Sequence, residues 1–200
     1  MNLENIVREA SLILKKHNIC SYELDAQVIL SDIMDTKREN LIINNKINIS
    51  EKIFKKYKTA IERRSKGEPV AYIIGKKEFW SKDFIVNSST LVPRPETELL
   101  IYKLINFFKN RRINILDIGT GSGCILLSIL KELQDSIGTG IDISPKAIEI
   151  AKKNSKRLNI FNRSKFRVFD FNKYVSGKYD LVVSNPPYIP SKDIKNLSKD

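Results

Sequence analysis

The sequence predicts an α/β protein in which a small all-helical domain, residues 1–70, precedes a parallel β-sheet with crossover helices. Apolar residues recur at helical spacing in the first part of the chain, a β-prone stretch follows, and strands then alternate with helices from about residue 110. The 200 residues are 42% hydrophobic and 29% charged, which is the composition of a globular protein and is enough for two domains.

The first domain is predicted from three amphipathic segments. Ile6, Ala10 and Leu14 lie on one face of the first helix. Ser21 is placed to cap the second helix, and Ser50 is placed to cap the third. Because each short helix must bury its apolar stripe, the helices together should form a small bundle.

A β-prone segment follows, and we interpret residues 71–94 as a β-hairpin linker. Its runs at 70–74, 78–80 and 84–86 are rich in β-branched and aromatic residues. Pro95 suits the first position of the helix that comes next, because its fixed φ fits a helical turn and its missing N–H is not needed there.

The second domain, residues 95–200, is predicted to contain four parallel strands. They are expected at residues 113–118, 138–143, 166–169 and 178–184, with helices at 124–133 and from Pro145 to about Arg157. In an open sheet of this kind, ligands bind in the crevice at the carboxyl ends of the strands. The loops that follow the strands are therefore the candidate functional segments.

A glycine-rich loop after the first strand is the first of these segments. It consists of Gly119, Thr120, Gly121, Ser122 and Gly123. Asp142 ends the second strand about twenty residues later, where an acid receives the ribose hydroxyls of an adenosine-containing cofactor. The G-x-G-x-G spacing differs from the G-x-G-x-x-G of dinucleotide enzymes, which disfavours a nicotinamide oxidoreductase. S-adenosylmethionine, which has no pyrophosphate, fits the tighter spacing better.

Asp170 and Phe171 follow the third strand. A carboxylate can accept a hydrogen bond from the amine of adenine, and an aromatic ring can stack on the base. Phe171 can equally belong to the core, and the residues alone leave both interpretations open.

The tetrad Asn185-Pro186-Pro187-Tyr188 follows the fourth strand and suits methyl transfer to a planar amide or amino nitrogen. Such a nitrogen is a poor nucleophile because its lone pair is delocalised. The Asn185 side-chain oxygen and the Pro186 carbonyl can accept its two N–H groups and favour the positive charge that grows on it. The prolines fix φ, and Tyr188 offers a face for stacking. We therefore predict Asn185, Pro186, Pro187 and Tyr188 as catalytic residues.

The remaining features restrict the function less. The net charge of +12 permits a nucleic-acid partner, although the basic residues are spread along the whole chain. His17, Cys20 and Cys124 are too few and too scattered for a metal site or a disulfide framework. Without a signal-like N-terminus or a long apolar run, we expect a cytoplasmic protein without a membrane segment.

Several motifs together resemble the release-factor glutamine methyltransferase family (PrmC/HemK). They lie at residues 67–69, 78–80, 92–98, 117–123, 142 and 185–188. The P-R-P-E-T-E stretch within 92–98 separates this family from the DNA and RNA methyltransferases that share an NPPY-type tetrad. The resemblance implies a Rossmann-like class I S-adenosylmethionine methyltransferase domain behind the helical domain and the hairpin.

The resemblance also implies the binding residues. S-adenosylmethionine would be held by Gly119, Thr120, Gly121, Ser122, Gly123, Asp142, Phe171 and Asn185. The substrate would be the glutamine of the Gly-Gly-Gln motif of peptide chain release factors, held by Asn185–Tyr188 and gripped through the helical domain. The enzyme is expected to be a monomer that does not require nucleic acid.

The chain departs from the family in length. Members of the family continue beyond the tetrad and complete a seven-stranded sheet, so we expect this domain to lack its C-terminal strands. Whether the chain is active therefore stays open at this point. The competing hypotheses are a methyltransferase acting on an exocyclic amine of DNA or RNA and a non-catalytic fragment that binds a partner.

Overall fold

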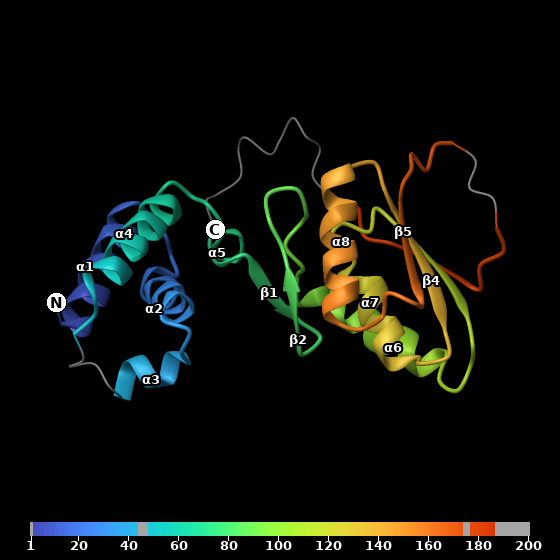
Figure 1. Cartoon of the computed structure of the whole chain (residues 1–200), viewed down its shortest axis with the longest axis horizontal. Helices are drawn as coiled ribbons and strands as arrows, with labels where there is room; N and C mark the ends of the chain where they lie inside the picture. The colour runs from blue at the N-terminus through green and yellow to red at the C-terminus, as the bar shows by residue number, and fades with distance from the viewer. Residues whose placement is uncertain (1, 44–47, 174–176, 187–200) are drawn as a thin grey trace. The chain divides into compact units, whose positions relative to one another are not determined.

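A computed structural model describes residues 2–43, 48–173 and 177–186 (Figure 1). The chain divides into two compact units, one ending at Ile74 and the next starting at Gly75. We call them the helical unit and the sheet unit. Among the described residues, no helix is long and apolar enough to cross a membrane.

The helical unit is a bundle whose helices bury one apolar face each. Its helices are α1 (Leu3–Lys16), α2 (Tyr22–Ile33), α3 (Arg38–Ile43), α4 (Glu51–Ser65) and α5 (Val70–Ile74). Ile6, Ala10 and Leu14 of α1 lie in the shared core, as their spacing predicts. The short helix α3 was not predicted, since its six residues are too few for a clear periodic pattern.

The predicted helix caps are partly confirmed. Ser50 accepts a hydrogen bond from the backbone N–H of Ile53 at the start of α4. Ser21 precedes α2, but its hydroxyl donates to the Asp25 carboxylate at 2.8 Å and does not cap the helix. The prediction for the Ser21 side chain was wrong because a buried carboxylate competes for the same hydroxyl.

Residues 70–74, predicted to be extended, form the short helix α5. The carbonyl of Pro69 accepts hydrogen bonds from the N–H groups of Tyr72 and Ile73 at 3.0 and 3.2 Å, which closes a helical turn. Val70 and Ile73 pack on the core of the bundle. Burial of these side chains therefore overrides the β-propensity of the segment.

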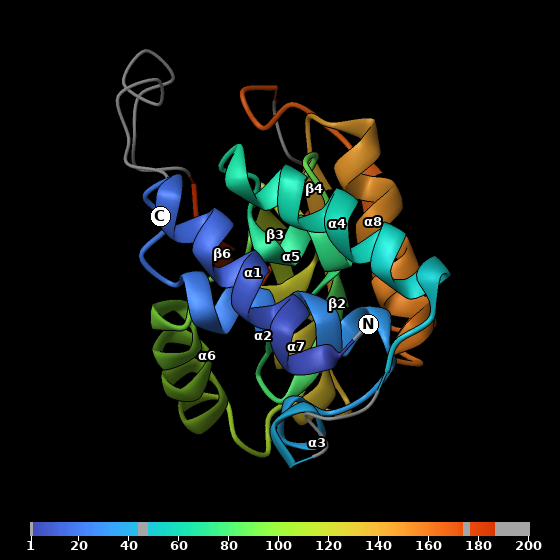
Figure 2. The same cartoon turned by 90° about the vertical axis from the view of Figure 1, so that its left-hand side faces the viewer.

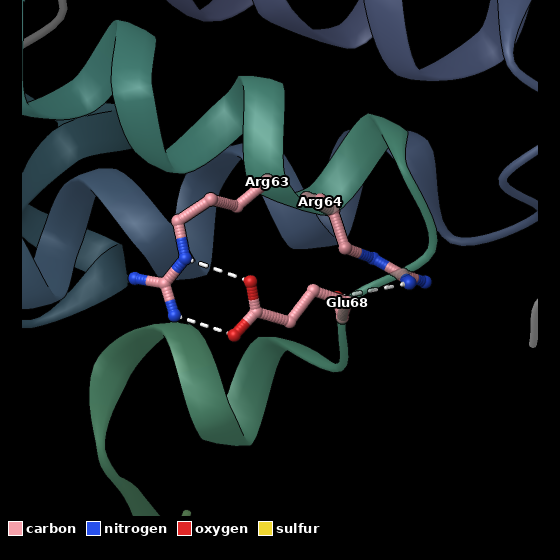
Figure 3. Close-up of polar contacts among 3 residues, drawn as sticks. All are labelled: Arg63, Arg64 and Glu68. Atoms are coloured by element: carbon pink, nitrogen blue, oxygen red, sulfur yellow. Dashed lines mark hydrogen bonds and ion pairs between the residues drawn. The ribbon is translucent and has the colours of Figure 1, made fainter. Parts of the chain in front are cut away.

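A polar cluster connects α2 to the end of α4. Arg64 donates through Nε to the Asp25 carboxylate at 2.7 Å, and both residues are buried. Figure 3 shows the neighbouring Arg63 guanidinium facing both carboxylate oxygens of Glu68, while Arg64 also reaches the Glu68 carbonyl, at 3.3 Å. The turn that leaves α4 is thus held by two adjacent arginines.

The sheet unit begins with a hairpin and continues as an open parallel sheet. Its elements are β1 (Lys76–Phe79), β2 (Lys82–Ile85), α6 (Glu96–Phe107), β3 (Asn114–Ile118), α7 (Cys124–Glu132), β4 (Ile137–Asp142), α8 (Pro145–Arg157), β5 (Ser164–Val168) and β6 (Leu181–Ser184). The strand order in the parallel sheet is β5-β4-β3-β6. All four predicted strands are present, although β5 begins two residues earlier and β6 three residues later than predicted.

Three helices cover one face of this sheet. In both Figure 1 and Figure 2, α6, α7 and α8 lie in a row with α7 in the middle. Apolar side chains of the helices, the strands and the hairpin form the core beneath them. Ser144 caps α8 by accepting from the N–H of Ala147, as predicted. Pro95, predicted as the first helical residue, is the N-cap of α6.

The hairpin turns at Trp80 and Ser81, both with left-handed backbones at φ 51° and 53°. Such values are unfavourable for side chains with a Cβ. Glu98 of α6 accepts a hydrogen bond from the Trp80 backbone N–H at 2.9 Å, and Glu132 of α7 accepts from the indole N–H at 3.0 Å. The turn is therefore supported by two helices that follow it in the sequence.

Candidate cofactor and substrate site

Three loops meet at the carboxyl edge of the parallel sheet. The register pairs Ile118, at the end of β3, with Ile141 of β4 on one side and with Ser184 of β6 on the other. The glycine loop, Asp142 and Asn185 therefore emerge next to one another, as the sequence predicts from the edge that parallel strands share. Ser184 also donates to the Ile118 carbonyl at 3.0 Å, which ties the end of β6 to β3.

All three glycines of the loop have left-handed backbones, with φ of 70° at Gly119, 55° at Gly121 and 79° at Gly123. A Cβ at Gly119 would meet no atom within 4 Å, so the space beside this residue is open to a ligand. A Cβ at Gly123 would lie 3.1 Å from the Leu127 side chain. Gly119 thus leaves room for a bound group, whereas Gly123 lets α7 pack closely.

The two polar side chains of the loop face the interior. Thr120 and Ser122 are only 5% and 2% exposed. Thr120 donates to the Asp117 carboxylate at 2.6 Å, while the Ser122 carbonyl accepts from Asn154 at 2.9 Å. Any contact of these two residues with a cofactor would therefore come from their backbones.

Asp142 joins the glycine loop to the start of α8. One carboxylate oxygen accepts the N–H of Gly121 at 3.0 Å, and the other accepts the N–H of Ser144 at 2.9 Å. A carboxylate oxygen can accept more than one hydrogen bond. The same side chain can therefore shape the loop and also receive hydroxyl groups of a ligand.

Asp117 is a further acid of this edge that we did not select from the sequence. It is 1% exposed at the end of β3, and desolvation raises its pKa to about 6, although the hydrogen bond from Thr120 opposes the rise. Its position in the sequence could have identified it as a candidate site residue, because an acid is rare in an interior parallel strand.

A cavity of about 360 Å³ lies at the ends of β4 and β5. Its lining consists of Ile143, Val168, Phe169, Asp170 and Lys173. Ile143 directly follows Asp142 and is 71% exposed, so it offers an apolar wall beside the carboxylate. Phe171 is 57% exposed and is not among the lining residues. The structure therefore places Phe171 on the surface, outside the core, and adds Ile143 as a residue that sequence reasoning missed.

Only half of the predicted catalytic tetrad belongs to the described residues. Asn185 follows β6 directly, and its side-chain Nδ2 lies 3.4 Å from the Thr97 hydroxyl oxygen at the start of α6. Pro186 comes next, while Pro187 and Tyr188 lie outside the described residues. The predictions for Pro187 and Tyr188 therefore stay predictions.

Asn154 of α8 was not predicted, yet it organises the loop from behind. It is completely buried; its oxygen accepts the N–H of Ile85 at 2.7 Å, and its nitrogen donates to the carbonyls of Ile85 and Ser122 at 3.0 and 2.9 Å. This side chain connects the hairpin to the glycine loop. No local sequence signal marks it, because its partners are 69 and 32 residues away.

The remaining candidate features are another cavity, His17 and Cys124. A cavity of about 410 Å³ between α8 and β5 is lined by Lys152, Lys156, Lys165 and Arg167, among others, and contains no predicted site residue. His17 is an exposed residue of the helical unit that contacts the Ile13 carbonyl. Burial raises the pKa of the Cys124 thiol to about 12, which makes it a poor nucleophile.

Comparison with known proteins places the two parts of the chain in the same family. Residues 5–75 match the family model of the PrmC N-terminal domain, and residues 95–198 match that of the methyltransferase small domain. The release factor glutamine methyltransferase of Buchnera aphidicola subsp. Schizaphis graminum is 39% identical over the whole chain, which spans 72% of that relative. The chain belongs to the release factor glutamine methyltransferase family.

Other relatives agree with this assignment. The release factor glutamine methyltransferase of Bradyrhizobium diazoefficiens is 36% identical over 98% of the chain and 68% of the relative. A solved S-adenosylmethionine-dependent methyltransferase from Thiobacillus denitrificans, in complex with S-adenosyl-L-homocysteine, is 30% identical with a TM-score of 0.39 over 46% of this chain and 36% of that one. The strand order of the parallel sheet and the match to the methyltransferase small domain show that the chain has the class I fold that its sequence predicts.

Proposed function

We propose that the protein transfers a methyl group from S-adenosylmethionine to the side-chain amide nitrogen of the glutamine in the Gly-Gly-Gln motif of peptide chain release factors. The observation that supports this most directly is the meeting of the glycine loop, Asp142 and Asn185 at one sheet edge, in a chain of this family. The substrate motif follows from the family resemblance.

The cofactor edge fits S-adenosylmethionine. The open space beside Gly119 admits a ligand close to the backbone, and the Asp142 carboxylate is fixed by two N–H groups. We assign the methionine part to Gly119–Gly123, the ribose to Asp142, and the adenine to the cavity beside Ile143. Phe171, which follows the lining residue Asp170 in the sequence, is assigned to stacking on the base. Asp170 lines this cavity, and its carboxylate can accept from the adenine amine.

The chain's contribution to the reaction is orientation and charge stabilisation. When bound, S-adenosylmethionine supplies an electrophilic methyl group, which leaves its sulfonium sulfur as the new carbon–nitrogen bond forms. The Asn185 side-chain oxygen and the Pro186 carbonyl accept the two N–H groups of the substrate amide and so direct its lone pair. The same oxygens stabilise the positive charge on nitrogen until one proton leaves to water. We assign Pro187 to fixing the backbone of the substrate site and Tyr188 to stacking on the substrate amide.

We assign the binding of the release factor to the helical unit. The outer face of α4 carries exposed Lys52, Lys55, Lys56 and Lys58, which suits an acidic protein surface. We further infer that the enzyme acts as a monomer in the cytoplasm and does not need nucleic acid.

The test is methyl transfer from S-adenosylmethionine with a labelled methyl group. Three acceptors are offered in parallel: a release factor, its Gly-Gly-Gln→Gly-Gly-Ala variant, and bulk nucleic acid. Label on the intact release factor alone is the expected result. Label on nucleic acid would instead support an exocyclic-amine methyltransferase, and no label on any acceptor would support the non-catalytic hypothesis.

Cofactor binding is tested separately by calorimetry with Asp142→Ala. Loss of a charged acceptor of the ribose should weaken the affinity roughly 10- to 150-fold. The matched control is Asp83→Ala, which removes an exposed carboxylate on the hairpin and should leave the affinity unchanged. Equal affinities of both variants would remove Asp142 from the cofactor site.

A further inference from the structure

The side chain of Thr97, in the first turn of α6, lies beside the side-chain amide of Asn185, which follows β6. The donor end of the Asn185 side chain, Nδ2, faces the Thr97 hydroxyl oxygen at 3.4 Å, although the residues are 88 positions apart. We propose that Thr97 is a positioning residue of the methyl-transfer reaction, which fixes Asn185 with its side-chain oxygen directed to the substrate amide. This inference rests on the proposed function, since it assigns a role to Thr97 in that reaction.

The two ends of an asparagine amide have nearly the same shape but opposite hydrogen-bonding roles. The nitrogen carries two donors, and the oxygen is an acceptor. If the amide flipped, Asn185 would present N–H groups to the N–H groups of the substrate and would repel the positive charge that develops there. Turnover therefore depends on which end of the Asn185 amide faces the substrate, and the structure has Nδ2 beside the Thr97 hydroxyl oxygen, which is the productive orientation.

Thr97 can stabilise this orientation because its own position is fixed. Its backbone N–H donates to the Arg94 carbonyl at 3.1 Å, and the N–H of Glu98 donates to the Pro95 carbonyl at 2.9 Å. The Glu98 carboxylate in turn accepts from the backbone of Trp80 in the hairpin. Threonine is also branched at Cβ, which restricts its χ1 angle. The hydroxyl is thus held by the start of α6 before any substrate arrives.

The backbone on the other side of the contact is fixed as well. Ser184 pairs with Ile118 in the sheet, and its hydroxyl donates to the Ile118 carbonyl. The contact with Thr97 then restrains the side-chain torsions of Asn185. A support of this kind acts on the rate of the chemical step more than on binding, because it concerns the orientation of the reacting groups.

The experiment compares Thr97→Val, which keeps the shape and removes the hydroxyl, with Thr97→Ser, which keeps the hydroxyl. We expect Thr97→Val to lower kcat for the release factor roughly 5- to 30-fold, the effect of one lost hydrogen bond in the transition state. The KM for the release factor and the Kd for S-adenosylmethionine should change less than about twofold. Thr97→Ser should restore most of kcat.

The matched control is Thr139→Val in β4, the same change at a half-buried threonine that lines a cavity with Asn114 and Ile137 at the starts of β3 and β4. It should leave kcat unchanged. A wild-type kcat in Thr97→Val, or no recovery in Thr97→Ser, would overturn the proposal. A loss confined to the cofactor Kd would also overturn it, because Thr97 would then act on the cofactor.

A second measurement does not depend on activity. The side-chain ¹⁵N–¹H resonances of Asn185 should shift and broaden in Thr97→Val but not in Thr97→Ser, because the amide loses its fixed acceptor. Unshifted resonances would refute the contact even if kcat fell. If the wild type methylated no release factor, the proposed function would fail, while the resonances would still decide whether Thr97 holds Asn185.

Discussion

Buried and half-buried polar side chains serve different purposes in the two units. In the helical unit, Asp25 and Arg64 pair mainly with each other and connect α2 to α4, with further hydrogen bonds from Ser21 to Asp25 and from Arg64 to the Glu68 carbonyl. In the sheet unit, Asp142 and Asn154 instead satisfy backbone groups of the loops around the cofactor edge. A pair of side chains can be replaced together by apolar residues, whereas backbone groups remain when their partner is removed. We therefore expect the first arrangement to affect stability alone and the second to affect cofactor binding as well.

The largest effect on stability is expected from Arg64→Met. This change leaves the Asp25 carboxylate buried without its counter-charge and should lower the free energy of unfolding by about 3–5 kcal/mol. The double variant Asp25→Leu/Arg64→Met should recover most of the loss. Urea unfolding measures both, and a double variant as unstable as the single one would contradict the comparison. The cofactor Kd should not change in the double variant.

Asn154→Leu tests the opposite arrangement. It leaves the N–H and carbonyl of Ile85 and the carbonyl of Ser122 without their partner, at an expected cost of about 2–4 kcal/mol. Unlike the double variant of the ion pair, it should also weaken cofactor binding, because the glycine loop loses its support. The control is Asn106→Leu on the exposed face of α6, which should stay within about 0.5 kcal/mol of the wild type.

Asp117→Asn should stabilise the protein, because the ionised carboxylate is buried. Its pKa is raised to about 6, so folding favours the protonated form between the unfolded pKa of about 3.9 and pH 6. Above pH 6, the free energy of unfolding of the variant should exceed that of the wild type by about 2–3 kcal/mol. This difference should disappear as the pH falls toward 4. Thermal unfolding as a function of pH measures this difference. An advantage that grew toward low pH would have the wrong sign.

The smallest effect on stability is expected from Gly119→Ala. Its φ of 70° costs a residue with a Cβ about 1 kcal/mol, but the new methyl group meets no protein atom. Cofactor affinity should fall more than stability, since the methyl group occupies the open space. In Gly123→Ala, crowding against Leu127 adds to the backbone strain, so stability should fall further than in Gly119→Ala. Calorimetric titration and thermal unfolding separate the two.

The sequence predicted those parts of the fold that depend on local patterns. The four parallel strands, the cap at Ser144 and the end of a strand at Asp142 follow from short-range rules of burial, capping and turn geometry. The glycine loop was located for the same reason, because left-handed backbones favour glycine.

The features that were missed depend on distant partners. Residues 70–74 are helical because their side chains pack on the bundle core. The Ser21 hydroxyl donates to the Asp25 carboxylate, which becomes buried only when the unit folds. Asn154 and Thr97 obtain their roles from contacts 69 and 88 positions away. No window of the sequence contains both partners of such a contact, so local reasoning could not select these residues.

The left-handed turn at Trp80 has a consequence for the order in which the protein forms during synthesis. Its two supports, Glu98 and Glu132, are translated 18 and 52 residues after the tryptophan. A ribosome adds roughly 5–20 residues per second, so the tip of the hairpin emerges seconds before the helices that hold it. The tip of the nascent hairpin therefore lacks its first support until α6 has left the exit tunnel and its second until α7 has followed. Synthesis from the N-terminus thus completes the helical bundle first and fixes the hairpin only together with the cofactor edge.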